Sequence, residues 1–411
     1  MKTMMKILGI FFTLTAAASA QVVPAATGAG GAAAVKNLNY SFRYSESAQF
    51  SAILSNWQTS TASGTLDYAN GSERFPSTLE YAGGYNWTIV GPAYGDGQFH
   101  HLFLSQGIVG RKWKVLVGDD VSYLPQAPTT GFSGIPGIGE PIGVPNPNPT
   151  SSQSILTLNT HVVDNVLNGE VGYKLSGATT LGGGGSLELL RYPNHDGFNT
   201  DTQTADANLE RRFNSRNLVQ GKYSFSRYSY TDYSVTFDTN AAMLGYEHQW
   251  TRNLTTIASA GPQWISSSIS SVVPSSLNVE ANAVVNYRHQ FTSTGLTYFH
   301  GVNGGAGFQF GGESDTLTAN LSRDFGASLT VGLTGGYLRN AALVGATTIT
   351  GAYGGAQATK RIGRNLIVFA NYTGTDQSST SPLPTNAVNQ LLQVVGFGVG
   401  YSSPREYHAR Q

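Results

Sequence analysis

Hydrophobic and polar residues alternate along many stretches of this chain. In residues 327–337, Leu329 and Val331 occupy alternate positions, and the positions between and around them carry Ser, Thr and Gly. The same alternation recurs in residues 279–290 and 315–324. Successive side chains of a β-strand point to opposite faces, so the pattern predicts strands with one apolar face and one polar face.

A short turn sequence recurs about every 37 residues, a period that solenoids and propeller blades also show. Each copy has a basic or amide-rich strand end, an apolar residue, small polar residues and then Leu or Ile. The copies begin at Arg211, His248, Arg288, Arg323 and Arg361, with a looser copy at Tyr173. A hairpin of a membrane barrel has a similar length, because it needs two strands of about ten residues, a short turn and a longer loop.

The composition of the polar face separates a barrel from a soluble sheet. Only 12% of the residues are charged, whereas ordinary soluble domains carry about 25%. Soluble sheets protect their exposed edges with charged side chains, and a closed barrel has no edge to protect. The pattern therefore favours a barrel, and a secreted soluble propeller or lectin remains the alternative.

The N-terminus has the features of a secretory signal peptide. Lys2 and Lys6 precede an apolar stretch that is too short to cross a bilayer, and small residues end at Ala20. We expect cleavage between Ala20 and Gln21. The predicted organisation is a signal peptide, a flexible periplasmic lead-in, a transmembrane barrel and a short polar tail, at residues 1–20, 21–36, 37–401 and 402–411.

The last strand completes a family resemblance. Val395, Phe397, Val399 and Tyr401 alternate with glycines. With the signal peptide, the repeated turns and the alternating strands, the chain resembles bacterial outer-membrane β-barrel proteins of the porin-like kind. The resemblance implies a place in the outer membrane, contact with its lipid and insertion by the barrel assembly machinery. Many such proteins end on the aromatic residue itself, and here residues 402–411 follow it.

The predicted fold is an all-β, antiparallel, up-and-down barrel with short periplasmic turns and longer outer loops. Eighteen strands are expected, and sixteen is the competing number because the first two hairpins show the weakest pattern. The expected hairpins are 37–54/61–69, 79–90/98–106, 112–120/160–175, 180–191/206–213, 216–229/238–250, 253–264/279–290, 293–302/315–324, 326–339/346–361 and 364–374/389–401.

The longest loop, residues 121–158, is rich in proline and glycine and cannot be a strand. It is the third outer loop. The resemblance implies that such a loop folds into the lumen and narrows it, which makes Thr129, Phe132, Glu140 and Gly143 a candidate constriction. A stiff external loop is the alternative.

Alternation places a set of charged side chains inside the barrel, because charges are costly on a lipid face. They are Arg43, Glu80, Lys112, Lys114, Glu170, Lys174, Glu188, Lys222, Glu247, Glu280 and Arg288. Their near balance predicts weak ion selectivity. The alternative is that they pair across strands and only brace the interior.

Enzymatic motifs are absent from the sequence, including nucleophile elbows, zinc-protease helices and phosphate-binding loops. His100 and His101 point to opposite faces of a strand and cannot share a metal. We therefore predict no catalytic residue, no metal and no cofactor. The equal numbers of acidic and basic residues argue against nucleic-acid binding.

A weakly selective channel for passive diffusion of small solutes is the leading hypothesis. A structural or adhesive barrel plugged by its loops, acting through residues 192–205 and 265–278, is the alternative, and a barrel enzyme is the least favoured. The sequence does not indicate the solute or the oligomeric state.

Overall fold

The computed structural model describes most of the barrel, in residues 36–51, 57–91, 96–124, 161–195, 197–268, 273–305, 309–326, 328–381 and 391–402. Among these residues, no helix is long and apolar enough to cross a membrane. The signal peptide with Ala20 and Gln21, almost all of the lead-in and all but the first residue of the tail lie outside the described residues.

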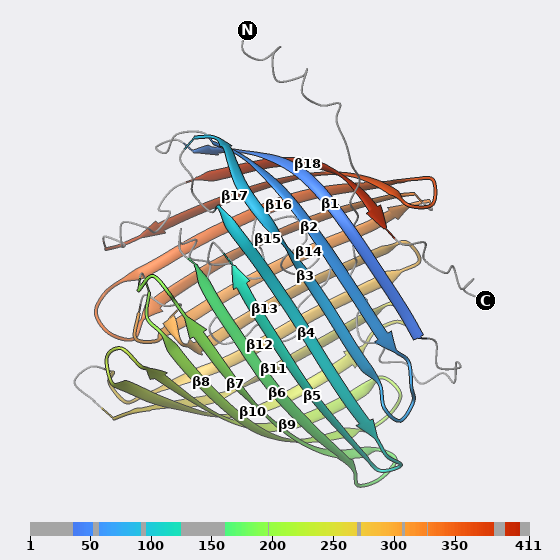
Figure 1. Ribbon diagram of the computed structural model, residues 1–411. Helices are drawn as coiled ribbons and strands as arrows, with labels where there is room; N and C mark the ends of the chain where they lie inside the picture. The colour runs from blue at the N-terminus through green and yellow to red at the C-terminus, as the bar shows by residue number, and fades with distance from the viewer. Residues whose placement is uncertain are drawn as a thin grey trace, which may run out of the picture.

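The described residues form one closed antiparallel sheet (Figure 1). Each strand pairs with its neighbours in the chain, and the first strand also pairs with the last, from Ser41 opposite Ser402 to Ser51 opposite Leu392. The strands are β1 Lys36–Ser51, β2 Trp57–Asn70, β3 Ser77–Val90, β4 Gly97–Val109, β5 Trp113–Leu124, β6 Val162–Lys174, β7 Thr179–Arg191, β8 Thr200–Arg212, β9 Asn217–Tyr230, β10 Val235–Gln249, β11 Leu254–Ser267, β12 Ser276–His289, β13 Thr292–Asn303, β14 Gly312–Phe325, β15 Leu329–Ala342, β16 Thr348–Ile362, β17 Leu366–Ser379 and β18 Leu392–Ser402.

The prediction of an eighteen-stranded antiparallel barrel is confirmed, and sixteen strands are excluded. The barrel runs from Lys36 to Ser402, one residue beyond the predicted bounds at each end. Short turns join the strands at one end and longer connections join them at the other. In outer-membrane barrels the short turns are periplasmic, so we call the two ends the periplasmic and outer ends.

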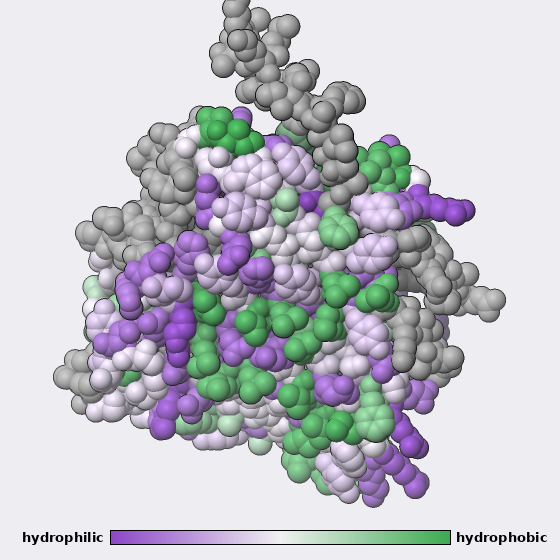
Figure 2. All heavy atoms as spheres, in the orientation of Figure 1, coloured by the Kyte–Doolittle hydropathy of each residue, from purple (hydrophilic) through white to green (hydrophobic). Residues whose placement is uncertain are grey.

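The outer surface of the barrel is apolar. Large hydrophobic side chains stand out from alternate strand positions, and Leu244 and Leu277 are 67% and 65% exposed. Hydrophobic side chains gather over the strands on the face seen in Figure 2. A soluble protein of this size does not leave so much apolar surface to water, and a closed barrel leaves no backbone edge unpaired in lipid. The molecule is therefore built as a β-barrel that spans a membrane.

Ion pairs occupy outward positions near the outer end, above the apolar surface. The Arg227 guanidinium donates to both Asp238 carboxylate oxygens at 2.8 Å across β9 and β10. Arg191 donates to one Asp201 carboxylate oxygen across β7 and β8. The strands therefore extend beyond the hydrocarbon into the polar region outside it.

Candidate solute pathway in the barrel lumen

The inward face of the strands is polar from the first strand onward. The exposed Leu38, Tyr40 and Phe42 point outward from β1, so Ser41 and Arg43 between them point inward. The strand register carries this assignment around the barrel. It places ten of the predicted pore-lining residues at inward strand positions: Arg43, Glu80, Lys114, Glu170, Lys174, Glu188, Lys222, Glu247, Glu280 and Arg288.

Lys112 is the exception among the predicted residues. β5 begins at Trp113, so Lys112 lies in the periplasmic turn before it, where its carbonyl oxygen accepts the Lys174 backbone N–H at 2.6 Å. Its side chain is exposed, and because Lys112 is not part of a strand, the alternation of inward and outward positions does not apply to it. The expected constriction residues Thr129, Phe132, Glu140 and Gly143 lie outside the described residues.

The same register brings further charged residues to the inward face that the sequence analysis did not single out. The acidic ones are Asp67, Asp120, Asp164, Asp206, Glu210 and Asp324, and the basic ones are Arg212 and Arg361. With these included, acidic side chains outnumber basic ones on the described inward face. Strict alternation within each strand would have identified all of them.

Acidic residues of neighbouring strands line up across the first half of the sheet. Asp67 of β2 lies directly opposite Glu80 of β3. Phe103 of β4 lies opposite Glu80 on one side and Asp120 of β5 on the other. His101 Nε2 contacts Asp120 Oδ1 at 2.8 Å. These side chains therefore share one row that crosses four strands.

The row continues through β6 to β8. Val166 of β6 lies opposite both Asp120 and Glu188 of β7, and Asp164 is the next inward position of β6. Thr202 of β8 lies opposite Glu188. We call Asp67, Glu80, Asp120, Asp164 and Glu188, with His101 among them, the acidic track.

The acidic track climbs the lumen wall, because a row perpendicular to tilted strands rises around a barrel. Asp67 lies close to Asn70, at the periplasmic end of β2. Thr202, just past the track, lies close to Thr200, at the outer end of β8. A solute that follows this row would therefore cross most of the height of the barrel.

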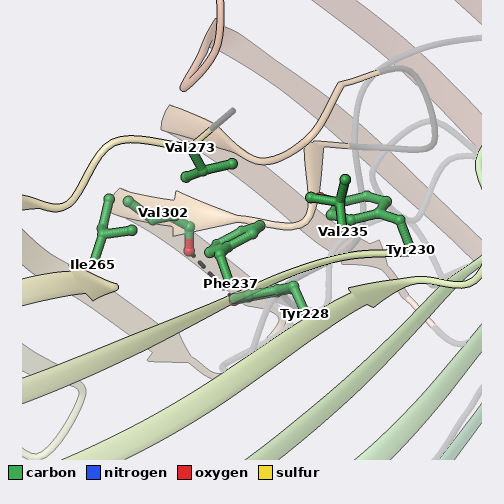
Figure 3. Packing of buried hydrophobic residues seen from close by; sticks show 7 residues of the cluster. All are labelled: Tyr228, Tyr230, Val235, Phe237, Ile265, Val273 and Val302. Atoms are coloured by element: carbon green, nitrogen blue, oxygen red, sulfur yellow. Dashed lines mark hydrogen bonds between the residues drawn. The ribbon is translucent and has the colours of Figure 1, made fainter. Parts of the chain in front are cut away.

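Hydrophobic side chains close over part of the outer mouth (Figure 3). The outer-mouth cluster consists of Tyr228, Tyr230, Val235, Phe237, Ile265, Val273 and Val302, with Phe198, Phe310, Leu343 and Val344 packed against it. The rings of Tyr228 and Phe237 stack with centroids 4.7 Å apart. This apolar packing within the mouth of a polar lumen narrows the entrance above β9 and β10.

The end of β13 crosses the mouth to complete this cluster. The Tyr230 hydroxyl donates to the Gly304 carbonyl oxygen at 2.8 Å, and the Val302 N–H donates to Gln263 Oε1 at 3.1 Å. Gln263 points inward from β11, so the chain leaving β13 leans over the inner face of the neighbouring wall. In the described part of the barrel, the residues that directly follow β13 therefore narrow the outer mouth.

The lumen shows no metal centre in the part of the chain that the structure describes, where no three His, Asp or Glu side chains come close enough to hold an ion. His100 lies on the outer surface and contacts the Tyr81 hydroxyl at 2.9 Å, whereas His101 faces the lumen. The two adjacent histidines are on opposite faces, as the strand geometry predicted.

Comparisons with solved structures find folds similar to this chain at low sequence identity. No protein-family model and no curated protein sequence matches it. OccK2 (OpdF) of Pseudomonas aeruginosa is 12% identical with a TM-score of 0.48, covering 90% of this chain and 97% of its own. OccAB3 of Acinetobacter baumannii is 10% identical with a TM-score of 0.45, covering 90% and 98%. OpdK of Pseudomonas aeruginosa, solved with vanillate, is 10% identical with a TM-score of 0.45, covering 89% and 98%.

The likeness is one of architecture, which the closed sheet of eighteen strands already establishes. The function proposed below rests on the residues of this barrel.

Proposed function

We propose that the protein is an outer-membrane channel through which small water-soluble solutes diffuse passively. The observation that carries this proposal is the sorting of side chains in a closed barrel of eighteen strands. Apolar side chains predominate on the outward face, and Ser, Thr, Asn, Gly and charged side chains predominate on the inward face. A barrel of about this strand number encloses more space than its own side chains fill, and a polar wall keeps that space wet.

The nearly balanced set of charges found in the sequence predicts weak ion selectivity. The fuller inward set has an acidic excess, and the acidic track concentrates it along one wall. Fixed carboxylates raise the local concentration of cations and lower that of anions. We therefore propose a cation-preferring channel instead of an unselective one.

Reversal potentials of the purified barrel in a planar bilayer test this function. In a salt gradient, the wild type should show a potential of the sign of cation preference, and Glu80→Gln with Asp120→Asn should reduce it. These substitutions remove two neighbouring track charges and keep the side-chain shape. A potential of zero or of the opposite sign in a conducting channel would contradict the proposed selectivity.

A sealed structural or adhesive barrel is the second candidate, and the outer-mouth cluster is the observation in its favour. The same bilayer measurement separates the two, because a sealed scaffold inserts without conducting. A barrel that stays silent in the wild type and conducts after Phe237→Ala would identify the cluster as the seal and replace the open channel with the plugged one.

A further inference from the structure

We propose that the acidic track binds an extended organic cation with two or more amino groups, such as a linear polyamine. This inference rests on the proposed function, because the ligand must reach the lumen, and it names a substrate class for that channel. It goes beyond ion preference because it requires the track residues to act together on one molecule.

The spacing of the track suits separate ammonium groups. Neighbouring strands lie about 4.8 Å apart, so the five steps from β2 to β7 cover about 24 Å. The carboxylates are distributed along this length, and nowhere in the described lumen do they gather into a group that could hold a metal ion. A series of separate negative charges along a line fits a flexible chain with positive charges at intervals.

Among the inward side chains that the structure describes, the lysines and arginines lie away from the middle of the track. The inward lysines of its strands, Lys114 and Lys174, lie at the periplasmic ends of β5 and β6. Arg43 of β1 approaches only the Asp67 end, and its guanidinium lies 5.4 Å from the centre of the Phe369 ring. Within the middle, His101 is the basic partner, and it contacts Asp120.

Within the described residues, two acceptor atoms make no hydrogen bond, one on Asp164 of the track and one on Thr202 just past its upper end. The Thr202 side chain is 2% exposed, and its hydroxyl makes no hydrogen bond. Asp164 Oδ1 is likewise buried without a hydrogen bond. Buried polar atoms are nearly always satisfied in folded proteins, and an ammonium group carries only donors. A bound amine between β6 and β8 would supply the missing donors.

Polyamine block of the channel tests the inference, with spermidine as the probe. Spermidine should interrupt the current of the full-length barrel in a planar bilayer, and n-butylamine, with one charge, should not. Asp120→Asn should shorten the blocked time about tenfold, a loss typical of one charge-assisted contact. Glu80→Gln is a second track variant, in case the first does not fold.

Asp119→Asn is the matched control. Asp119 is adjacent to Asp120 in β5 but faces outward, where its Oδ1 accepts the Asn165 amide at 2.8 Å. The Asp119→Asn substitution removes the same charge from the same strand as Asp120→Asn does. Because residue 119 does not face the lumen, block by spermidine should remain as in the wild type. Equal loss in Asp119→Asn and Asp120→Asn would overturn the proposal, because the effect would then follow net charge and not the track.

Calorimetric titration of spermidine into the detergent-solubilised barrel separates this inference from the proposed function. A conducting channel without block or binding overturns the polyamine site and leaves the channel in place. A silent barrel that binds spermidine, and loses binding with Asp120→Asn, supports the site and overturns passive conduction. A silent barrel without binding overturns both.

Discussion

The assignment of inward and outward faces predicts opposite outcomes for two adjacent substitutions in β11. Ala260 points outward and lies opposite Leu244 and Ala281 in the neighbouring strands. Ser259, one residue earlier, points inward and lies opposite Gly245. Ala260→Arg should therefore put a charge in lipid, and Ser259→Arg should put the same charge in the lumen.

The position of Ala260 sets the size of the effect. β11 has 14 residues, and with a rise of about 3.4 Å per residue and a tilt of about 40° it spans about 34 Å. Ala260 lies about 16 Å above Leu254 by the same arithmetic, at the middle of an apolar band about 25 Å tall. An arginine at that depth costs about 2–4 kcal/mol, which lowers the ratio of folded to unfolded barrel roughly 30- to 700-fold.

Ser259→Arg should cost much less, because water, Glu247 and Glu280 are within the same lumen. The assay is reversible guanidinium unfolding of each variant in lipid vesicles, followed by the heat-dependent shift of the folded band on gels. Equal destabilisation by the two substitutions would refute the assignment of faces. Greater destabilisation by Ser259→Arg would show that the barrel is turned the other way and has an apolar interior.

Two further results follow from particular contacts. Gly261→Ala should destabilise the barrel by about 1–3 kcal/mol, because a Cβ there would lie 1.9 Å from the Ala242 carbonyl oxygen. Gly221→Ala is the control: a Cβ there meets nothing within 4 Å, so the unfolding midpoint should stay nearly unchanged. Equal shifts of the midpoint in the two variants would contradict this packing. Phe237→Ala removes a side chain that is 0% exposed, so it should cost about 3–5 kcal/mol and raise single-channel conductance; an unchanged conductance would show that the outer-mouth cluster does not limit the current.

The number and order of the strands could be predicted from the sequence because lipid and water impose opposite demands on alternate residues. The positions of several outer strand ends could not be predicted in this way. β8 begins at Thr200, whereas alternation placed its start at residue 206, and β14 begins at Gly312 instead of residue 315. The outward residues of these extensions include Asp201 and Glu313, which stand above the apolar surface. Where the outside is also polar, period two in hydrophobicity disappears although the strand continues.

The periplasmic ends were predicted more closely for the same physical reason. There the apolar alternation runs almost to the turn, and the recurring turn sequence marks where it stops. β9 begins at Asn217 and β12 ends at His289, each within one residue of the expected bound. A strand boundary is therefore predicted accurately where the strand ends at the edge of the apolar band, and poorly where the strand continues beyond it.

The acidic track shows what alternation within a strand cannot reveal. Asp67, Glu80, Asp120 and Glu188 are spread over more than a hundred residues of sequence, and each lies in a different strand. They share a row only because each hairpin is staggered against the next, and that stagger is set by turn and loop lengths around the whole barrel. Alternation gives only the total numbers of acidic and basic residues on the inward face, and their near balance led to the prediction of weak ion selectivity. The register gives their order in space, and a line of carboxylates acts on an extended cation in a way that the same charges scattered over the wall would not.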